Sequence, residues 1–183
     1  MDNGASSYLR FLKGDNDAFV EIIRQYKDGL VLFINSFVCN IHLSEEAADE
    51  AFLKLYVNKP RFKSGNSFKT WLYTIGRNTA LNYLKKSKRI SSKPIDDYYY
   101  ISDETDIEAE YIKGEQNIIL HQAIGSLKKE YAQVLYLIYF EELTNDETAH
   151  IMGKTQRQLS DLIYRAKNSL RSELERRGYN GQI

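Results

Sequence analysis

Aromatic and basic side chains alternate between Arg61 and Arg89, a mixture that can hold a nucleic acid whose strands have separated. Aromatic rings stack on unpaired bases for about 1–3 kcal/mol per base, while Lys and Arg side chains hold the phosphate backbone. Helical spacing places Phe68 and Tyr83 on a core face, so part of the set serves packing alone. The rings are Phe62, Phe68, Trp71, Tyr73 and Tyr83, and the basic residues are Arg61, Lys63, Lys69, Arg77, Lys85, Lys86, Lys88 and Arg89.

The charges along the chain are segregated, although 25 basic and 25 acidic residues cancel in total. Residues 51–95 contain 11 basic side chains and no acidic one, whereas acidic residues dominate 1–50 and 96–118. A basic zone of this kind attracts polyanions, of which nucleic acid is the usual one. The alternative is a solvated helix face, but such faces normally mix the two signs.

Residues 145–164 have the spacing of a helix-turn-helix. Ala149 is small where two helices must cross, Gly153 gives the turn its backbone freedom, and Leu159 anchors the second helix on the first. Gln156 and Arg157 would then lie near base edges, with Arg165, Lys167 and Arg171 near phosphates. A plain helical hairpin is the alternative, and Asp161 predicts a weak contact with DNA unless it accepts from cytosine or pairs with an arginine.

The segment from Ser44 to Asn58 is predicted to be a two-sided helix with Ser44 as its N-cap. Ala48, Ala51, Phe52 and Leu55 form its apolar stripe. The other face carries Glu46, Asp49 and Glu50, with Leu53 exposed among them. An acidic face around one leucine is typical of a docking surface for a basic protein helix, although a solvated face explains these residues equally well.

Helical signals dominate the chain, and the sequence predicts an all-α fold of two small domains. A helical bundle is expected in residues 1–90, and a four-helix domain with the helix-turn-helix in 116–183. A flexible acidic linker is expected in 91–115. The predicted helices are 16–38, 44–58, 68–88, 117–126, 129–141, 145–152 and 156–176.

The sequence gives no sign of an enzyme, a metal site or a cofactor site. His42, His121 and His150 are scattered, and no nucleophile–base or phosphate-loop spacing occurs. Cys39 is the single cysteine, so no disulfide framework is possible within the chain. No apolar run is long enough to span a membrane and no signal peptide is evident, so we expect a soluble cytoplasmic protein.

Taken together, these segments resemble an extracytoplasmic-function sigma factor, a small two-domain class of bacterial transcription initiation factors. SEEAADEAFLKLY resembles the region-two helix that binds the clamp helices of the largest RNA polymerase subunit. FKTWLYTIGRNTALNYLKKSKR is similar to the segment that reads and melts the −10 promoter element. AIGSLKKEYAQVLYLIYFEELTNDETAHIMGKTQRQLSDLIYRAKNSL is similar to region four, which binds the polymerase flap and reads the −35 element.

The resemblance implies core RNA polymerase and promoter DNA as partners, with an anti-sigma factor as a further possible one. The implied polymerase-binding residues are Glu46, Asp49, Glu50 and Leu53. The implied −10 contacts are Arg61, Phe62, Lys63, Asn66, Trp71, Arg77, Asn78, Lys85, Lys86 and Arg89. The implied −35 contacts are Thr155, Gln156, Arg157, Gln158, Ser160, Asp161, Arg165 and Lys167. The chain departs from the family pattern at Lys128, Ser160 and Leu162, where the family usually has proline, a basic residue and arginine.

Two other functions account for parts of the sequence. A free-standing helix-turn-helix regulator predicts a dimer on a palindrome, but leaves the acidic docking face and the exposed rings unexplained. A sigma-like protein that acts only through protein contacts is mildly favoured by Asp161 and Leu162. The sigma-factor hypothesis predicts two weak DNA contacts made cooperative by a shared scaffold, and therefore little promoter binding by the free protein.

Overall fold

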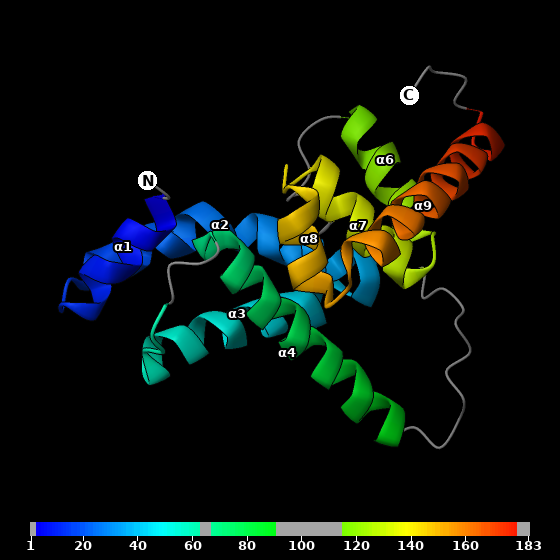
Figure 1. Ribbon diagram of the computed structural model, residues 1–183. Helices are drawn as coiled ribbons and strands as arrows, with labels where there is room; N and C mark the ends of the chain where they lie inside the picture. Colours follow the sequence, from blue (N-terminus) through cyan, green and yellow to red (C-terminus); the bar gives the residue numbers. More distant parts are fainter. Residues whose placement is uncertain (1–2, 63–66, 91–114, 179–183) are drawn as a thin grey trace.

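The computed structural model describes residues 3–62, 67–90 and 115–178, and within these ranges it forms eight helices and no strand (Figure 1). This confirms the all-α prediction. The helices are α1 (Asn3–Leu12), α2 (Asn16–Val38), α3 (Ile41–Asn58), α4 (Phe68–Ile90), α6 (Glu115–Gly125), α7 (Lys129–Tyr139), α8 (Asn145–Met152) and α9 (Gln156–Arg176).

The predicted acidic linker lies almost wholly outside the described residues, so the predicted domain boundaries stay predictions. None of the helices in the described ranges contains an apolar stretch of the length needed to span a lipid bilayer.

Local capping explains where α2 and α3 begin and end. The Asp15 side chain caps α2 by accepting from the backbone N–H of Ala18, and Cys39 ends it in the left-handed conformation at φ 55°. The prediction that Ser44 caps the next helix is wrong, because Asn40 accepts from the N–H of Leu43 and α3 begins three residues earlier. Ser44 is buried inside the helix, and its hydroxyl donates to the carbonyl of Asn40 at 2.7 Å.

Helix α1 was not predicted from the sequence, although it completes the core of the first unit, which we define as α1–α4. Its segment contains Gly4 and two serines, which are weak helix formers, so helix propensity alone gives little signal. Tyr8 and Phe11 are fully buried, and this packing holds the helix in place. At its end, Arg10 forms ion pairs with Asp15 and Glu21.

Helices α2, α3 and α4 pack against one another, and α1 packs against α2 and α4. The axes of α2 and α4 come close at Gly76, where an added Cβ would lie 2.7 Å from a methyl carbon of Leu30. This crossing fixes the direction of α4, which extends away from the rest of the molecule at its far end (Figure 1).

The second unit consists of α6–α9, and α7 is its central helix. It packs against α6, α8 and α9, and Ala132, Val134, Leu135 and Leu137 are fully buried. Capping boxes start both helices of the predicted helix-turn-helix: Thr144 pairs with Glu147 at α8, and Thr155 with Gln158 at α9. The predicted helix α9 is confirmed, and of its predicted apolar face Leu159, Ala166 and Leu170 are buried while Ile163 is partly buried against the core.

The two units pack directly on each other, a contact that the sequence did not predict. Helix α2 contacts α6 and α7, and α4 contacts α8. The six consecutive α2 residues 30–35 are all buried, so at this level the helix is covered all the way around. The ring of Phe33 lies 6.2 Å from that of Tyr136, which joins the cores of the two units.

Candidate nucleic-acid interface

Trp71 and Phe62 belong to an aromatic cluster at the start of α4. The Trp71 ring lies 5.3 Å from Tyr8, 5.4 Å from Phe62 and 5.7 Å from Phe68, measured between ring centroids. Phe68 and Tyr8 are buried, whereas Trp71 and Phe62 are only partly buried. Each of the latter two rings therefore keeps some surface toward solvent. Arg61 beside them is exposed, while the predicted contacts Lys63 and Asn66 lie outside the described residues.

Tyr8 supports this cluster from α1, and sequence reasoning missed it. Its hydroxyl donates to the carbonyl oxygen of Pro60 at 2.8 Å, just before the segment that carries Arg61 and Phe62. Burial raises the pKa of the Tyr8 phenol to about 12, so the phenol stays a neutral donor. Tyr8 thereby fixes the chain where it enters the predicted −10 segment. No periodic signal in a ten-residue helix pointed to this role.

The far half of α4 presents polar and basic side chains to solvent. Asn78, Lys85 and Lys86 are exposed, and Arg89 lies in the last turn of the helix. Tyr83, on the neighbouring face, donates to a carboxylate oxygen of Glu50 at 2.5 Å. This half of α4 is therefore a basic surface attached to α3 along one side.

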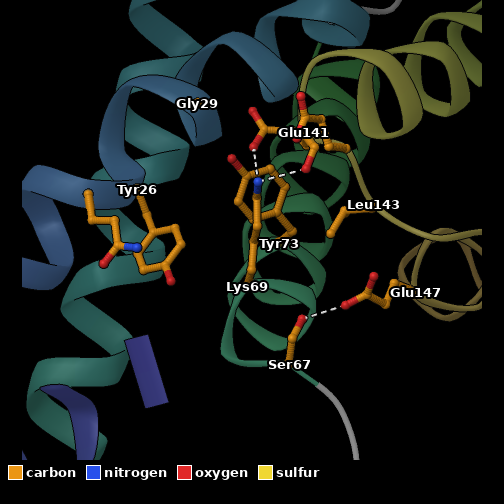
Figure 2. A pocket seen from close by; sticks show the side chains of 10 residues that line it. Tyr26, Gly29, Ser67, Lys69, Tyr73, Glu141, Leu143 and Glu147 are labelled. Atoms are coloured by element: carbon orange, nitrogen blue, oxygen red, sulfur yellow. Dashed lines mark hydrogen bonds and ion pairs between the residues drawn. The ribbon is translucent and has the colours of Figure 1, made fainter. Parts of the chain in front are cut away.

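Two cations of the basic segment face the second unit instead of solvent. Arg77 is half-buried, and its Nε donates to Oε1 of the buried Gln133 on α7 at 2.7 Å. Burial lowers the pKa of the Arg77 guanidinium from its ordinary value. Lys69 Nζ lies 2.8 Å from a carboxylate oxygen of Glu141 and 2.8 Å from the carbonyl oxygen of the same residue (Figure 2).

A polar hollow of about 430 Å³ lies between α2, the start of α4 and the segment that joins α7 to α8. Ser67, just before α4, donates to a carboxylate oxygen of Glu147 on α8 at 2.7 Å. Figure 2 shows these two side chains pointing toward each other. Thr70 donates to the same carboxylate oxygen at 3.2 Å. Burial alone would raise the pKa of Glu147, but hydrogen bonds from Ser67, Thr144 and Thr70 lower it on balance. The hollow is thus part of the contact between the two units.

The geometry of α8, the turn and α9 is that of a helix-turn-helix. Gly153 has φ 62° and ψ 39°, and the N–H of Lys154 returns to the carbonyl of Ala149 at 2.9 Å. Leu159 is fully buried under the turn. All eight predicted −35 residues have exposed side chains on α9 or at its cap. These residues therefore form one accessible surface at the N-terminal half of the helix.

Within that surface, several polar side chains already form hydrogen bonds or ring contacts with neighbouring residues of the same unit. Gln158 accepts from the N–H of Thr155 at 2.9 Å as part of the capping box, and Gln156 donates to Asp146. Arg165 donates to the backbone carbonyl of Asp161 at 3.2 Å and not to its carboxylate. Ser160 donates to the carbonyl of Gln156, and Lys167 lies over the ring of Tyr139.

Two further residues of α9 clarify what this surface contains. Tyr164 is 70% exposed and lies among the predicted contacts, although it was not in the predicted set. Leu162, where the family usually has arginine, is 3% exposed and belongs to the core. Together with Arg157 and Asp161, Tyr164 offers side chains that reach outward from the helix.

The predicted docking face on α3 is only partly acidic. Glu46 is exposed, and Asp49 forms an ion pair with Lys27 at 3.2 Å. Glu50 accepts from Lys54, one turn further along α3, and from Tyr83 on α4, and these two hydrogen bonds lower its pKa. Leu53 is 58% exposed and continues into Tyr56 and Val57, which are also exposed. The face therefore has a larger apolar part than the sequence suggested.

The two units match two regions of one protein family. The family model of sigma-70 region 2 matches residues 22–90, and that of sigma-70 region 4 matches residues 117–170. The chain is 29% identical to the ECF RNA polymerase sigma factor SigW of Bacillus subtilis over 88% of this chain and 91% of that protein. It is 28% identical to the RNA polymerase sigma-H factor of Pseudomonas aeruginosa over 91% of each.

Two solved structures share the fold. The sigma factor RpoE in complex with the anti-sigma factor NepR from Bartonella quintana has a TM-score of 0.67 at 19% identity, over 86% of this chain and 96% of that one. CnrH in complex with the cytosolic domain of CnrY has a TM-score of 0.64 at 17% identity, over 94% and 95% of the two chains. The chain belongs to the sigma-70 family of transcription initiation factors, within its extracytoplasmic-function class. It is a sigma factor of RNA polymerase and not an enzyme.

Proposed function

We propose that the first unit binds core RNA polymerase through α3 and opens promoter DNA at the −10 element through the loop before α4 and α4 itself. Trp71 and Phe62 keep exposed ring surface on which unpaired bases can stack. Arg61 next to these rings, and Lys85 and Lys86 on the far half of α4, are exposed cations that can hold the strand backbone. Asn78 on the same helix supplies a polar group for base edges.

The second unit reads the −35 element through α9 in this proposal. Arg157 near the start of the helix is placed to contact base edges, and Arg165 to contact phosphates. The Asp161 carboxylate weakens the contact with phosphates, because Arg165 bonds to its backbone carbonyl and leaves the charge exposed. We therefore expect promoter affinity to depend on the polymerase, which holds both contacts at a fixed spacing.

One observation carries the proposal: a single chain presents a half-exposed aromatic cluster beside a basic helix and, separately, an exposed helix-turn-helix surface. A free-standing helix-turn-helix regulator has no use for the first of these surfaces.

An anti-sigma partner for this chain stays a prediction from the resemblance. We place the protein in the cytoplasm, where it would meet the polymerase.

The test is reconstitution with a purified bacterial core RNA polymerase and a promoter selected by the wild-type protein from a random-sequence library. Lys85→Ala/Lys86→Ala should lower strand opening, measured as permanganate reactivity of unpaired thymines, by about tenfold. The control is Lys129→Ala, since Lys129 is an exposed lysine of the second unit away from α9's predicted contacts. Equal opening by the double variant and wild type would contradict the −10 assignment.

The polymerase contact is tested in the same system with two exposed leucines. Leu53→Asp should weaken binding to core polymerase by about tenfold, because a buried leucine contributes about 1.5 kcal/mol or more at an interface. Leu9→Asp is the matched control, since Leu9 is 51% exposed on α1, outside the predicted docking face. If the two variants bind equally well, α3 is not the docking surface.

A further inference from the structure

We propose that the hydrogen bond between Glu50 and Tyr83 is a positioning bridge, which fixes the strand-opening half of α4 relative to α3. Because the polymerase holds α3, docking then also aligns the basic surface of α4 with the DNA. The inference rests on the proposed functions of α3 and α4. It gives Glu50 a role inside the first unit, in place of the polymerase contact that the resemblance implies. Three observations support it.

The first observation is a chain of hydrogen bonds that joins α3 to α4. The Tyr83 hydroxyl donates to one carboxylate oxygen of Glu50 at 2.5 Å, and Lys54 Nζ lies 2.6 Å from the other. Lys54 in turn donates to the hydroxyl oxygen of Thr79 at 2.9 Å, and Thr79 is buried. Both carboxylate oxygens of Glu50 therefore accept within the first unit, and two positions of α4 one helical turn apart are attached to α3.

The second observation is that the predicted acidic face of α3 forms two separate rows. Glu46, Asp49 and Leu53 are exposed to solvent and form one row. Glu50 and Lys54, one turn apart, are only partly exposed and form the row next to α4. A partner that docks on the first row therefore holds α3 and leaves the positioning bridge intact.

The third observation is the place of the bridge along α4. Tyr83 and Thr79 contact α3, whereas Lys85 and Lys86, which directly follow them on the helix, are exposed. The far end of α4 extends away from the rest of the molecule (Figure 1). A hydrogen bond between side chains of two helices restricts both their separation and their rotation. The bridge therefore sets the direction in which the two lysines point.

The charge of the Glu50 carboxylate strengthens the bridge. The hydrogen bond to Glu50 raises the pKa of Tyr83 to about 12, so the phenol stays a neutral donor. Hydrogen bonds from Lys54 and Tyr83 lower the pKa of Glu50, and so does the nearby charge of Lys86. A hydrogen bond to an ionised acceptor is stronger than one between neutral groups. Removal of the phenol oxygen alone should therefore loosen the contact between the helices while the ring keeps its packing.

The test uses Tyr83→Phe in the full-length protein, with permanganate reactivity of a duplex promoter as the readout. Core polymerase is saturating, so a change in its affinity does not contribute. Tyr83→Phe should slow opening about fivefold, because a misplaced group serves its step poorly, while the affinity for core polymerase stays within about twofold of wild type. Tyr131→Phe is the matched control, since Tyr131 is a partly buried tyrosine of the second unit, and it should open the promoter like wild type.

A template that is already open separates positioning from a loss of folding. On the same promoter with a non-complementary −10 segment, Tyr83→Phe should transcribe as well as wild type, because the strands are apart from the start. Equal impairment on both templates would mean a general defect and would contradict the bridge.

Glu50→Ala tests whether the two side chains act as one unit. Combined with Tyr83→Phe, it should slow opening no more than the slower of the two single variants, since both changes remove the same hydrogen bond. Effects that multiply would show that Glu50 acts apart from Tyr83 and would overturn the bridge.

The two possible failures are distinguishable. Equal opening of the duplex promoter by Tyr83→Phe and wild type would overturn the bridge alone. A wild-type protein that opens no duplex promoter with core polymerase would instead contradict the proposed function.

Discussion

Side chains on α4 differ in direction although they resemble one another in chemistry. Lys69 and Arg77 face the second unit, whereas Lys85 and Lys86 face solvent. Because both groups carry the same kind of charge, the sequence placed them in one predicted surface. Their separation depends on Glu141 and Gln133, which lie more than 50 residues further along the chain.

His121 gives the second unit a pH-dependent stability. Its ring lies 4.3 Å from that of Phe140, and burial lowers its pKa from the ordinary 6.5 to about 4. Between these two values the unfolded chain binds the proton more readily than the folded one, so stability falls as the pH drops from 6.5 toward 4. We expect a loss of about 1–2 kcal/mol between pH 7 and pH 5 from this residue.

The measurement is urea unfolding of the full chain at both pH values, followed by circular dichroism. His121→Leu should remove this part of the pH dependence, while carboxylates such as Glu173 continue to titrate at lower pH. A pH dependence identical in wild type and variant would show that the imidazole does not contribute.

At the scale of the elements, capping determines the helix-turn-helix. Two capping boxes and one left-handed glycine align α8 with α9, and all three are local in sequence. This explains why the bounds of α8 and α9 were predicted correctly, whereas the start of α3 was predicted three residues too late. Asn40 and Ser44 are both good cap residues, and only burial of Ser44 against Asn35 decides between them.

Gly153→Ala should destabilise the protein by about 1 kcal/mol, because a residue with a Cβ is strained at φ 62°. Thermal unfolding of full-length protein measures this as a lower Tm. Gly125→Ala is the matched control: its Cβ would meet no atom within 4 Å, and its φ is not positive. A Tm equally high in both variants would contradict the argument.

At the scale of the whole molecule, the two units share one core. Residues 30–35 of α2 are buried partly by α6 and α7, so the stability of α2 should depend on the second unit. Leu135→Ala, at a fully buried position of α7, should cost about 2–5 kcal/mol in that unit. We expect faster amide hydrogen exchange in α2 as well as in α7. Exchange in α2 equal to that of wild type would show that the units are independent.

The sequence alone determined the helical class, the helix-turn-helix, the basic aromatic segment and the family, since each depends on spacing or on composition within a short stretch. The candidate contacts Arg157 and Asp161 could be placed in this way, because one helix period sets their direction. Tertiary structure decided the role of Tyr8, the turn of Glu50 toward Tyr83, and the pairing of Arg77 with Gln133. These contacts join residues far apart in the chain, and their free energy comes from packing that exists only once the helices have assembled.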